Sequence, residues 1–298
     1  MHVPVLVKEV IAHLNPKKGE VIVDATIGNA GHAIEILKKI GASGRLIGLD
    51  QDAGSLETAR VNLQAAGFKN VDLANENFRE LDKVLEHLKI KEVNGVLMDI
   101  GINSDQLELS GRGFSFLKDE PLLMTMKNNL GPNDLTAREI VNKWSEKELA
   151  DIIFKYGEER FSRRIARNIV EKRKRKPIET TLELVEIIRL SVPPNYRNSK
   201  RLHCATRTFQ ALRITVNDEL GALMEGLGKA WMALGKEGRL VVISFHSLED
   251  RIVKNYFREL AKNEEGKILT KKPIVPTEAE EKDNPRSRSA KLRAIEKN

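Results

Sequence analysis

The sequence predicts a parallel, doubly wound α/β sheet that is interrupted by an inserted all-helical domain. Short β-branched runs alternate with helical patterns as far as Asp99, the alternation stops from residue 105 to about 210, and a further strand pattern follows at Arg239–Ser244. Sheets of this kind bind ligands beyond the carboxyl ends of their strands. Functional residues are therefore expected where the strands end.

Short apolar runs in the first hundred residues are typical of buried parallel strands. They are Val21–Asp24, Leu46–Leu49, Val71–Ala74 and Val93–Asp99. Apolar residues at helical spacing lie between these runs, in segments closed by glycine or proline. The helices are expected at Leu6–Leu14, Ala33–Ile40, Ser55–Ala66 and Leu81–Leu88.

The interruption contains helical patterns and no convincing buried strand. Its helices are expected at Leu135–Val141, Glu146–Phe154, Ser162–Lys176 and Leu182–Leu190. After it, we expect helices at Asn217–Leu234 and Leu248–Leu260, an acidic loop through Asp283, and a half-exposed strand at Ala290–Ile295. The expected sheet domain is 1–105 with 211–298, and the expected helical insert is 106–210.

Composition favours a soluble enzyme or binding protein in a reducing compartment. Hydrophobic residues make up 41% of the 298 positions, and Cys204 is the single cysteine, which excludes a disulfide framework or thiolate metal cluster. The first residues do not resemble a secretion signal, and no apolar run is long enough to span a membrane. We therefore expect a cytoplasmic protein with no membrane partner and no metal.

The positive charge is concentrated in the insert. The net charge is +7, and residues 155–176 contain ten Lys or Arg against three Glu. On a helix, Arg163, Arg164 and Arg167 would lie off the apolar stripe. Further basic side chains follow at Lys200, Arg201, His203, Arg207, Arg213, Arg286, Arg288, Lys291 and Arg293. Any one cluster could be a solvated helix face, but several clusters together favour nucleic acid as partner.

The loop after the first strand predicts a nucleotide-cofactor site. Small residues at 25–31 lead into a helix whose first N–H groups can bind a ligand, and Asp50 ends the next strand, where it can accept ribose hydroxyls. His32, Phe78 and Asp99 also follow strand ends. Asp50 suits the ribose of a nicotinamide dinucleotide or of S-adenosylmethionine, and the loop departs from the strict dinucleotide fingerprint.

Motif-length stretches over nearly the whole chain match one known family. They are His2–Leu6, Gly28–His32, Leu97–Gly101, Arg112–Phe116, Tyr156–Ala166, Ala205–Arg213, Val242–Arg251 and Asn284–Arg293. On these stretches the chain resembles the bacterial 16S rRNA cytosine-N4 methyltransferases, the MraW/RsmH family.

This resemblance implies a class I, Rossmann-like methyltransferase domain that uses S-adenosyl-L-methionine. The implied reaction is methylation of the exocyclic amine of a cytidine in the decoding centre of 16S rRNA, within the small ribosomal subunit. The implied cofactor contacts are Ala30, Gly31, His32, Asp50, Phe78, Asp99 and Gln106. The oligomeric state is left open, with a homodimer as one option.

The implied reaction needs a group that accepts a proton or a hydrogen bond from a weakly nucleophilic amine. Asp99 is one candidate for this acceptor; alternatively, Asp99 only binds the cofactor. His246, after the fifth strand, is the other, with a structural or RNA-contacting role as its alternative. Cys204 is interpreted as a small buried residue, not a nucleophile.

Several positions depart from the family's pattern. Ala30 stands where a glycine is usual, and Leu123, Thr125 and Lys127 stand where two acids and an arginine are usual. These departures support a second hypothesis, a catalytically weak or silent ribosome-assembly protein that binds RNA and keeps the fold. A third hypothesis is a nicotinamide-dependent oxidoreductase, which dinucleotide binding would test.

Overall fold

The chain divides into two compact units, and the sheet lies in the first. The structure is a computed structural model, which describes residues 4–128, 130–131, 134–197 and 202–298. Unit 1 is Met1–Gly101 with Leu220–Asn298, and unit 2 is Ile102–Glu219. The limits of the functional domains expected from the sequence, at 105/106 and 210/211, stay a proposal.

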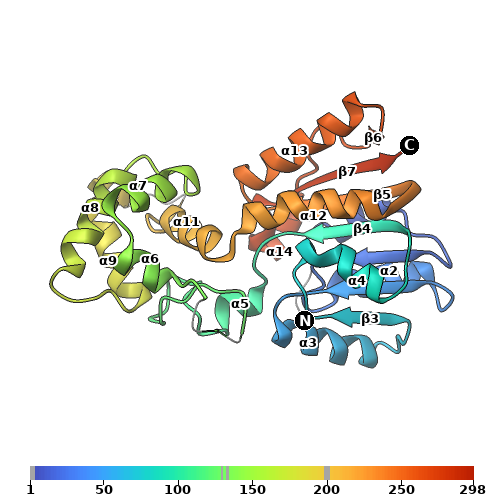
Figure 1. The fold of residues 1–298 in the computed structure, drawn as a ribbon, viewed down its shortest axis with the longest axis horizontal. Coiled ribbons are helices and arrows are strands. Elements are labelled where there is room, and N and C mark those ends of the chain that lie inside the picture. The colour runs from blue at the N-terminus through green and yellow to red at the C-terminus, as the bar shows by residue number, and fades with distance from the viewer. Residues whose placement is uncertain (1–3, 129, 132–133, 198–201) are drawn as a thin grey trace. The chain divides into compact units, whose positions relative to one another are not determined.

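Unit 1 contains a seven-stranded sheet in the order β3-β2-β1-β4-β5-β7-β6 (Figure 1). The strands are β1 (Val21–Asp24), β2 (Arg45–Leu49), β3 (Val71–Ala74), β4 (Val93–Asp99), β5 (Leu234–Ser244), β6 (Gly266–Ile268) and β7 (Lys291–Lys297). β1 to β5 are parallel, and β7 is antiparallel to β5 and β6. The chain runs outward from β1 to β3 and returns at β4, so β1 and β4 flank the switch point at which such sheets bind ligands.

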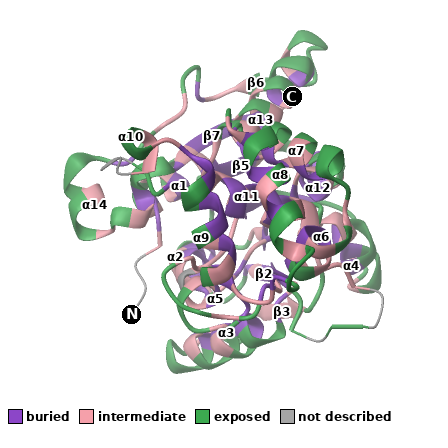
Figure 2. Ribbon diagram, turned by 90° about the vertical axis from the view of Figure 1, so that its left-hand side faces the viewer, coloured by how far each residue is buried: buried purple, intermediate pink, exposed green. Residues whose placement is uncertain are grey.

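Helices cover both faces of this sheet because successive strand residues point into two different apolar cores. In β4, Met98 packs in one core and Leu97 in the other. Figure 2 shows the inner strands coloured as buried. One core includes α1 (Val7–Leu14), α2 (Gly31–Ile40) and α3 (Ala53–Ala65). The other includes α4 (Leu81–His87), α12 (Glu219–Ala233) and α13 (Ser247–Lys262).

Unit 2 is helical, and its described residues form no strand. Its helices are α5 (Ser104–Glu108), α6 (Ala137–Lys143), α7 (Glu146–Lys155), α8 (Ser162–Arg173), α9 (Thr181–Ser191), α10 (Pro194–Arg197) and α11 (Thr206–Asn217). In α8, Ile165 and Ile169 are buried, whereas Arg163, Arg164 and Arg167 are exposed. The two faces predicted for this helix are therefore confirmed.

Three details of the sequence interpretation are wrong, and the short elements α5, α10 and β6 were not expected either. The helix α11 was not expected, although Phe209 and Leu212 in it are buried at helical spacing. The acidic segment forms α14 (Glu278–Asp283), whose first turn is capped by the Thr277 hydroxyl, which accepts the Glu280 N–H at 3.2 Å. The last strand is not half-exposed: β7 is paired on both sides, and residues 292–295 are buried.

In the part of the chain that the structure describes, no helix is long and apolar enough to cross a membrane.

Candidate cofactor site

The loop between β1 and α2 is built around residues with left-handed backbone geometry. Gly28 has φ +51° and Ala30 has φ +67°, a region that glycine adopts without strain. Ala30 is fully buried and precedes α2 as its N-cap, without a side chain that could cap the helix. The departure from the family's glycine therefore falls on a position whose backbone favours glycine.

The first turn of α2 presents backbone donors at the carboxyl end of β1. The N–H groups of the first turn of a helix have no partner within the helix, and the helix dipole favours a negative group there. Gly31 is packed closely, because a Cβ atom at this position would lie 2.9 Å from Pro4 Cγ. Gly31 and His32 thus begin a helix whose end suits a carboxylate such as that of an amino acid.

Asp50 joins the loops that follow β1 and β2. Its Oδ2 accepts the Gly28 N–H at 3.1 Å, and its Oδ1 accepts the Asp52 N–H at 2.8 Å. The side-chain amide of Asn75, which follows β3, donates to the Asp50 carbonyl at 2.9 Å. These contacts fix a carboxylate at the strand ends, in the position that binds ribose hydroxyls in related sheets.

Asp99 and His32 face each other at the switch point. His32 Nε2 lies 3.5 Å from Asp99 Oδ2, and the Asp99 N–H donates to Thr26 Oγ1 at 2.7 Å. Among the described residues, Asp99 Oδ1 and both ring nitrogens of His32 are buried without a hydrogen-bond partner. Buried polar atoms are nearly always satisfied, so these atoms suit a ligand with amine or hydroxyl groups.

Asp24 adds a buried acid that the sequence interpretation missed. It ends β1 with 1% of its surface exposed, and burial is the main cause that raises its pKa to about 7. The charge of His32 and the N–H of Thr26 oppose this shift. The carboxylates of Asp99 and Asp50 add to it. The signal in the sequence was an acid directly before the small-residue loop.

Phe78 begins the 3-10 helix η1 (Phe78–Glu80) after β3, where the Asn77 side chain accepts the Arg79 N–H at 3.0 Å. One side of its ring lies against α12, since a Cβ atom on Gly226 would be only 2.5 Å from Phe78 Cδ2. The ring is partly buried. An aromatic ring held in this way can contact a planar base.

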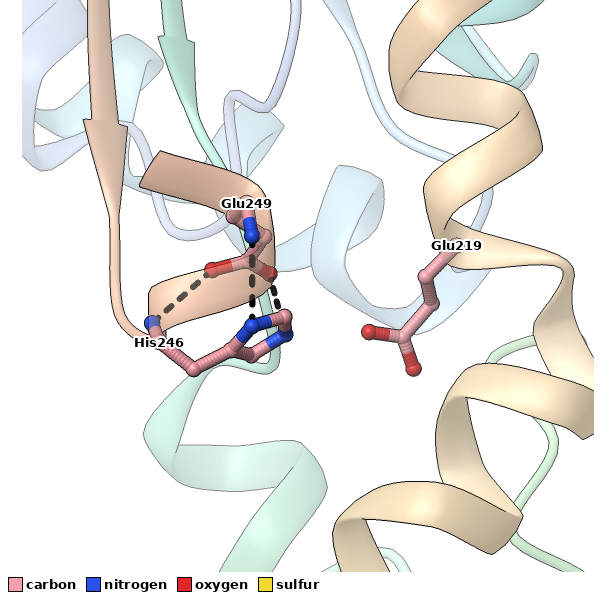
Figure 3. A group of neighbouring side chains, drawn as sticks. All are labelled: Glu219, His246 and Glu249. Carbon is pink, nitrogen blue, oxygen red and sulfur yellow. Dashed lines mark hydrogen bonds and ion pairs between the residues drawn. The ribbon is translucent and has the colours of Figure 1, made fainter. Parts of the chain in front are cut away.

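His246 caps the N-terminus of α13. Its Nδ1 accepts the Glu249 N–H at 3.3 Å, and Glu249 Oε2 accepts the N–H groups of His246 and Phe245 at 3.1 and 2.8 Å. The Nε2 of His246 lies 3.0 Å from Glu249 Oε1. Figure 3 shows the His246 ring beside the Glu249 carboxylate. The ring thus has a structural contact, and the catalytic role expected from the sequence stays a prediction.

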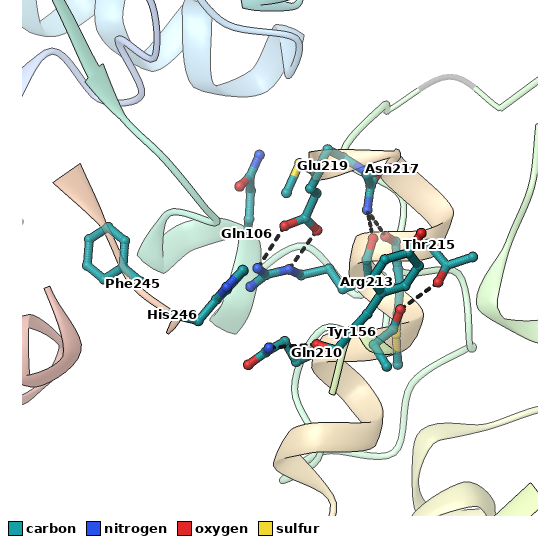
Figure 4. A network of polar contacts seen from close by, with 12 residues as sticks. Gln106, Tyr156, Gln210, Arg213, Thr215, Asn217, Glu219, Phe245 and His246 are labelled. Carbon is teal, nitrogen blue, oxygen red and sulfur yellow. Dashed lines mark hydrogen bonds and ion pairs between the residues drawn. The ribbon is translucent and has the colours of Figure 1, made fainter. Parts of the chain in front are cut away.

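Gln106 belongs to unit 2, whereas the other expected cofactor residues belong to unit 1. It is buried and forms a capping box with Asn103 at the start of α5. Figure 4 labels its side chain. Its Oε1 accepts the Asn103 N–H at 3.1 Å, and its own N–H donates to Asn103 Oδ1 at 2.8 Å. A contact of Gln106 with the cofactor stays a prediction.

Two arginines expected to contact nucleic acid are engaged inside the protein. Arg213 forms a bidentate pair with Glu219, with both distances 2.8 Å (Figure 4). Arg293 is buried, and its Nε lies 2.7 Å from Asp250 Oδ1. The predicted residues Lys200 and Arg201 lie outside the described residues. The exposed arginines of α8 are therefore the clearest basic surface of unit 2.

Comparison with known proteins agrees with this fold. A crystal structure of a protein from Streptococcus mutans in complex with SAH matches with a TM-score of 0.50, at 11% identity and over 100% of both chains. That match concerns the fold. A family model of methylases that matches residues 1–298, together with this fold, defines an S-adenosylmethionine-dependent methyltransferase of class I. The chain belongs to the MraW methylase family, whose model matches residues 1–298.

Relatives in this family are similar over almost their whole length. One from Clostridium botulinum (strain Kyoto / Type A2) is 47% identical over 311 residues, covering 99% of this chain and 98% of the relative. One from Sulfurihydrogenibium sp. (strain YO3AOP1) is 50% identical over 292 residues, covering 98% and 97%. Both are named Ribosomal RNA small subunit methyltransferase H.

Proposed function

We propose that this chain methylates the exocyclic N4 amine of a cytidine in the decoding centre of 16S rRNA, within the small ribosomal subunit. The names of its relatives support a small-subunit rRNA substrate. The observation that carries the chemical part is the buried, unpartnered Oδ1 of Asp99 beside His32, at the end of β4.

The residues at the strand ends can hold each part of S-adenosylmethionine. The backbone N–H groups at Gly31 and His32 suit its carboxylate, and the carboxylate of Asp50 suits its ribose hydroxyls. Ala30 belongs to the same loop, directly before Gly31. The ring of Phe78, which packs against Gly226 of α12, would lie beside the adenine. When bound, the cofactor supplies a methyl group made electrophilic by its sulfonium.

Asp99 would act on the amine that receives this methyl group. The cytosine amine is a weak nucleophile because its lone pair is delocalised into the ring. A carboxylate that accepts one N–H hydrogen bond orients the remaining lone-pair density, stabilises the positive charge that develops on nitrogen, and takes the released proton. A cytidine reaches such a pocket when its base is turned out of the stack.

His246 is the second candidate for this proton. Its ring nitrogens both lie near Glu249, and the cap that it forms already explains its position. Loss of the cap would lower the free energy of unfolding by about 0.5–2 kcal/mol. An effect of His246→Ala on the unfolding midpoint without a matching effect on methyl transfer would therefore assign it a structural role.

The exposed arginines of α8 would bind the phosphate backbone of the RNA. Arg163 and Arg164 are exposed beside Arg167, which is 3.6 Å from Glu146 and so only loosely paired. Contacts of this kind give affinity and register without reading sequence. The choice of cytidine would then come from the residues at the strand ends.

The departures from the family's pattern near residue 125 fit the fold of unit 2. Thr125 is buried and its hydroxyl accepts the Lys127 N–H at 3.2 Å, while Lys127 Nζ lies 3.0 Å from Asp134. Asn217 holds the same segment, donating to the Met124 carbonyl at 2.8 Å. Thr125 and Lys127 therefore have partners of their own, and these two departures are compatible with an intact fold of unit 2 in an active enzyme and in a silent ribosome-assembly protein alike.

The test is incubation of the full chain with labelled S-adenosylmethionine and small ribosomal subunits that lack the mark. We expect label in the rRNA, at the decoding-site cytidine. Subunit binding without label, under conditions in which the chain binds cofactor, would instead support the silent assembly protein. Label at another nucleotide would contradict the proposed target while leaving the methyltransferase activity in place.

A further inference from the structure

Three aromatic rings form a continuous array in unit 2, near the start of α11. Phe209 is buried, and its ring meets that of Phe116 edge-on, with centroids 5.7 Å apart and an interplanar angle of 86°. Phe116 is partly buried, and the His203 ring lies parallel to it at 4.6 Å and 6°. The array therefore extends from the core to the surface and ends with His203.

His203 is held in a fixed orientation although its side chain is exposed. Its Nδ1 accepts the Ala205 N–H at 3.3 Å, and its carbonyl accepts the Thr206 N–H at 3.1 Å. Desolvation at this position lowers the pKa of His203, which favours the neutral ring. One face is covered by Phe116, so the exposed area lies on the opposite face and the edge.

The surroundings of this ring combine apolar contact area with positive charge. Leu117 and Leu202, the chain neighbours of the two stacked residues, are 78% and 39% exposed. Lys118 is exposed next to Leu117. Arg197 and Arg189 are close enough to Cys204, the residue after His203, to act on its thiol electrostatically, as is Glu159. Arg189 is also paired with Glu186 at 2.7 Å. A flat π surface with leucines and cations around it suits a base attached to a phosphate backbone.

We propose that the outer face of His203, supported by Phe116, is a stacking platform for an unpaired nucleobase of the RNA. This inference rests on the proposed function and adds to it a second contact with RNA, remote in sequence from the strand-end residues. Unpaired bases stack on aromatic side chains, including histidine, and such contacts tolerate any base because every base has a π face. The platform would hold the single strand without selecting its sequence.

The test uses the full chain and a single-stranded RNA of about 12 nucleotides that carries one 2-aminopurine. Anisotropy gives the affinity, and quenching of 2-aminopurine reports stacking. His203→Ala should weaken binding about 5- to 100-fold and reduce the quenching. It should leave the slope of log affinity against log salt unchanged, because the variant keeps every cation that neutralises a phosphate. His203→Phe retains a π face and should keep both affinity and quenching.

His87 supplies the matched control, since it is an exposed histidine on α4 of unit 1. His87→Ala should bind as the parent chain does, and thermal unfolding should show that all variants are folded. Parent-like affinity in folded His203→Ala would overturn the platform, as would loss of quenching in folded His203→Phe. A parent chain that bound this RNA without quenching, or did not bind it, would also overturn the platform. The proposed function fails on a different result, the absence of label in small subunits, so the two failures are distinguishable.

Discussion

The backbone N–H of Gly28 donates a hydrogen bond of 3.1 Å to Oδ2 of Asp50. This contact ties the loop after β1 to the end of β2, so the loop and the carboxylate are positioned together. The second oxygen of Asp50 accepts the Asp52 N–H at 2.8 Å, which fixes the plane of the carboxylate. Asp50 is therefore oriented before any ligand arrives, which reduces the entropy lost on binding.

Asp50→Ala should weaken binding of S-adenosylhomocysteine about 10- to 100-fold, since hydrogen bonds to a charged group contribute about 1.5–3 kcal/mol. Isothermal titration calorimetry measures this change. Asp72→Ala is the matched control, because Asp72 lies on the neighbouring β3 and pairs with Arg45 at a part-exposed site. If the Asp50 variant and the control bound S-adenosylhomocysteine with equal affinity, Asp50 would not be part of the cofactor site.

Ala30→Gly should stabilise the fold. The left-handed backbone at φ +67° costs an alanine about 1–2 kcal/mol, and the extra freedom of glycine in the unfolded chain offsets roughly half of this. We expect the free energy of unfolding to rise by about 0.5–1 kcal/mol in urea titrations. Ala30→Val, which adds a branched side chain to a fully buried site, should lower it. A destabilised glycine variant would argue against strain at this position.

Asp24 should make stability fall as pH rises. Its pKa is about 7 in the folded chain against an ordinary value of 3.8, so between pH 4 and pH 7 the folded state binds a proton that the unfolded state has lost. Its contribution to the free energy of unfolding therefore decreases by up to about 1.4 kcal/mol per pH unit in this window and levels off above pH 7.

Asp24→Asn removes that titration. The difference in free energy of unfolding between Asp24→Asn and the parent should therefore shift in favour of the variant from pH 4 to pH 7. Urea unfolding at several pH values checks this expectation. Parallel curves for the two proteins would mean that Asp24 titrates in the folded chain as it does in the unfolded one.

The arginine face of α8 should contribute a salt-dependent part of RNA affinity. Replacing Arg163, Arg164 and Arg167 together by alanine should reduce the magnitude of the slope of log affinity against log salt. The expected reduction is about 0.7 for each phosphate of a single-stranded RNA that these arginines neutralise. Arg60→Ala, on the exposed surface of α3, serves as the control. If the triple variant kept the slope of log affinity against log salt of the parent chain, the arginines of α8 would not be part of the RNA-binding surface.

Most of the sheet could be predicted from the sequence because its strands are buried on both faces. Continuous β-branched runs such as Val21–Asp24 leave little choice of structure, and their ends were predicted closely. β7 was misjudged because its alternating pattern does not reveal that both faces of the strand are covered: Leu292 and Ala294 pack in one core, and Ile295 packs in the other. The short α14 has no apolar stripe, so its only local signal was the Thr277 cap followed by Glu280.

The strand-end residues were found because parallel strands bring their carboxyl ends to one edge. His32, Asp50 and Asp99 were predicted on that ground, and all three lie at that edge of the sheet. Asp24 was missed because sequence alone does not reveal that its carboxyl is buried among other acids. The internal pairing of Arg213 was likewise hidden, since charge counts do not distinguish a surface arginine from one bound to Glu219.

N4-methylcytidine in rRNA is the product of the proposed reaction, and its amount can be measured itself. Small subunits lacking the mark are incubated with the full chain and S-adenosylmethionine, and the nucleosides are then separated and identified by mass spectrometry. We expect N4-methylcytidine with the parent chain, and a rate of formation about 10²- to 10³-fold lower with Asp99→Asn at saturating cofactor. Absence of N4-methylcytidine with a parent chain that binds its cofactor would contradict the account.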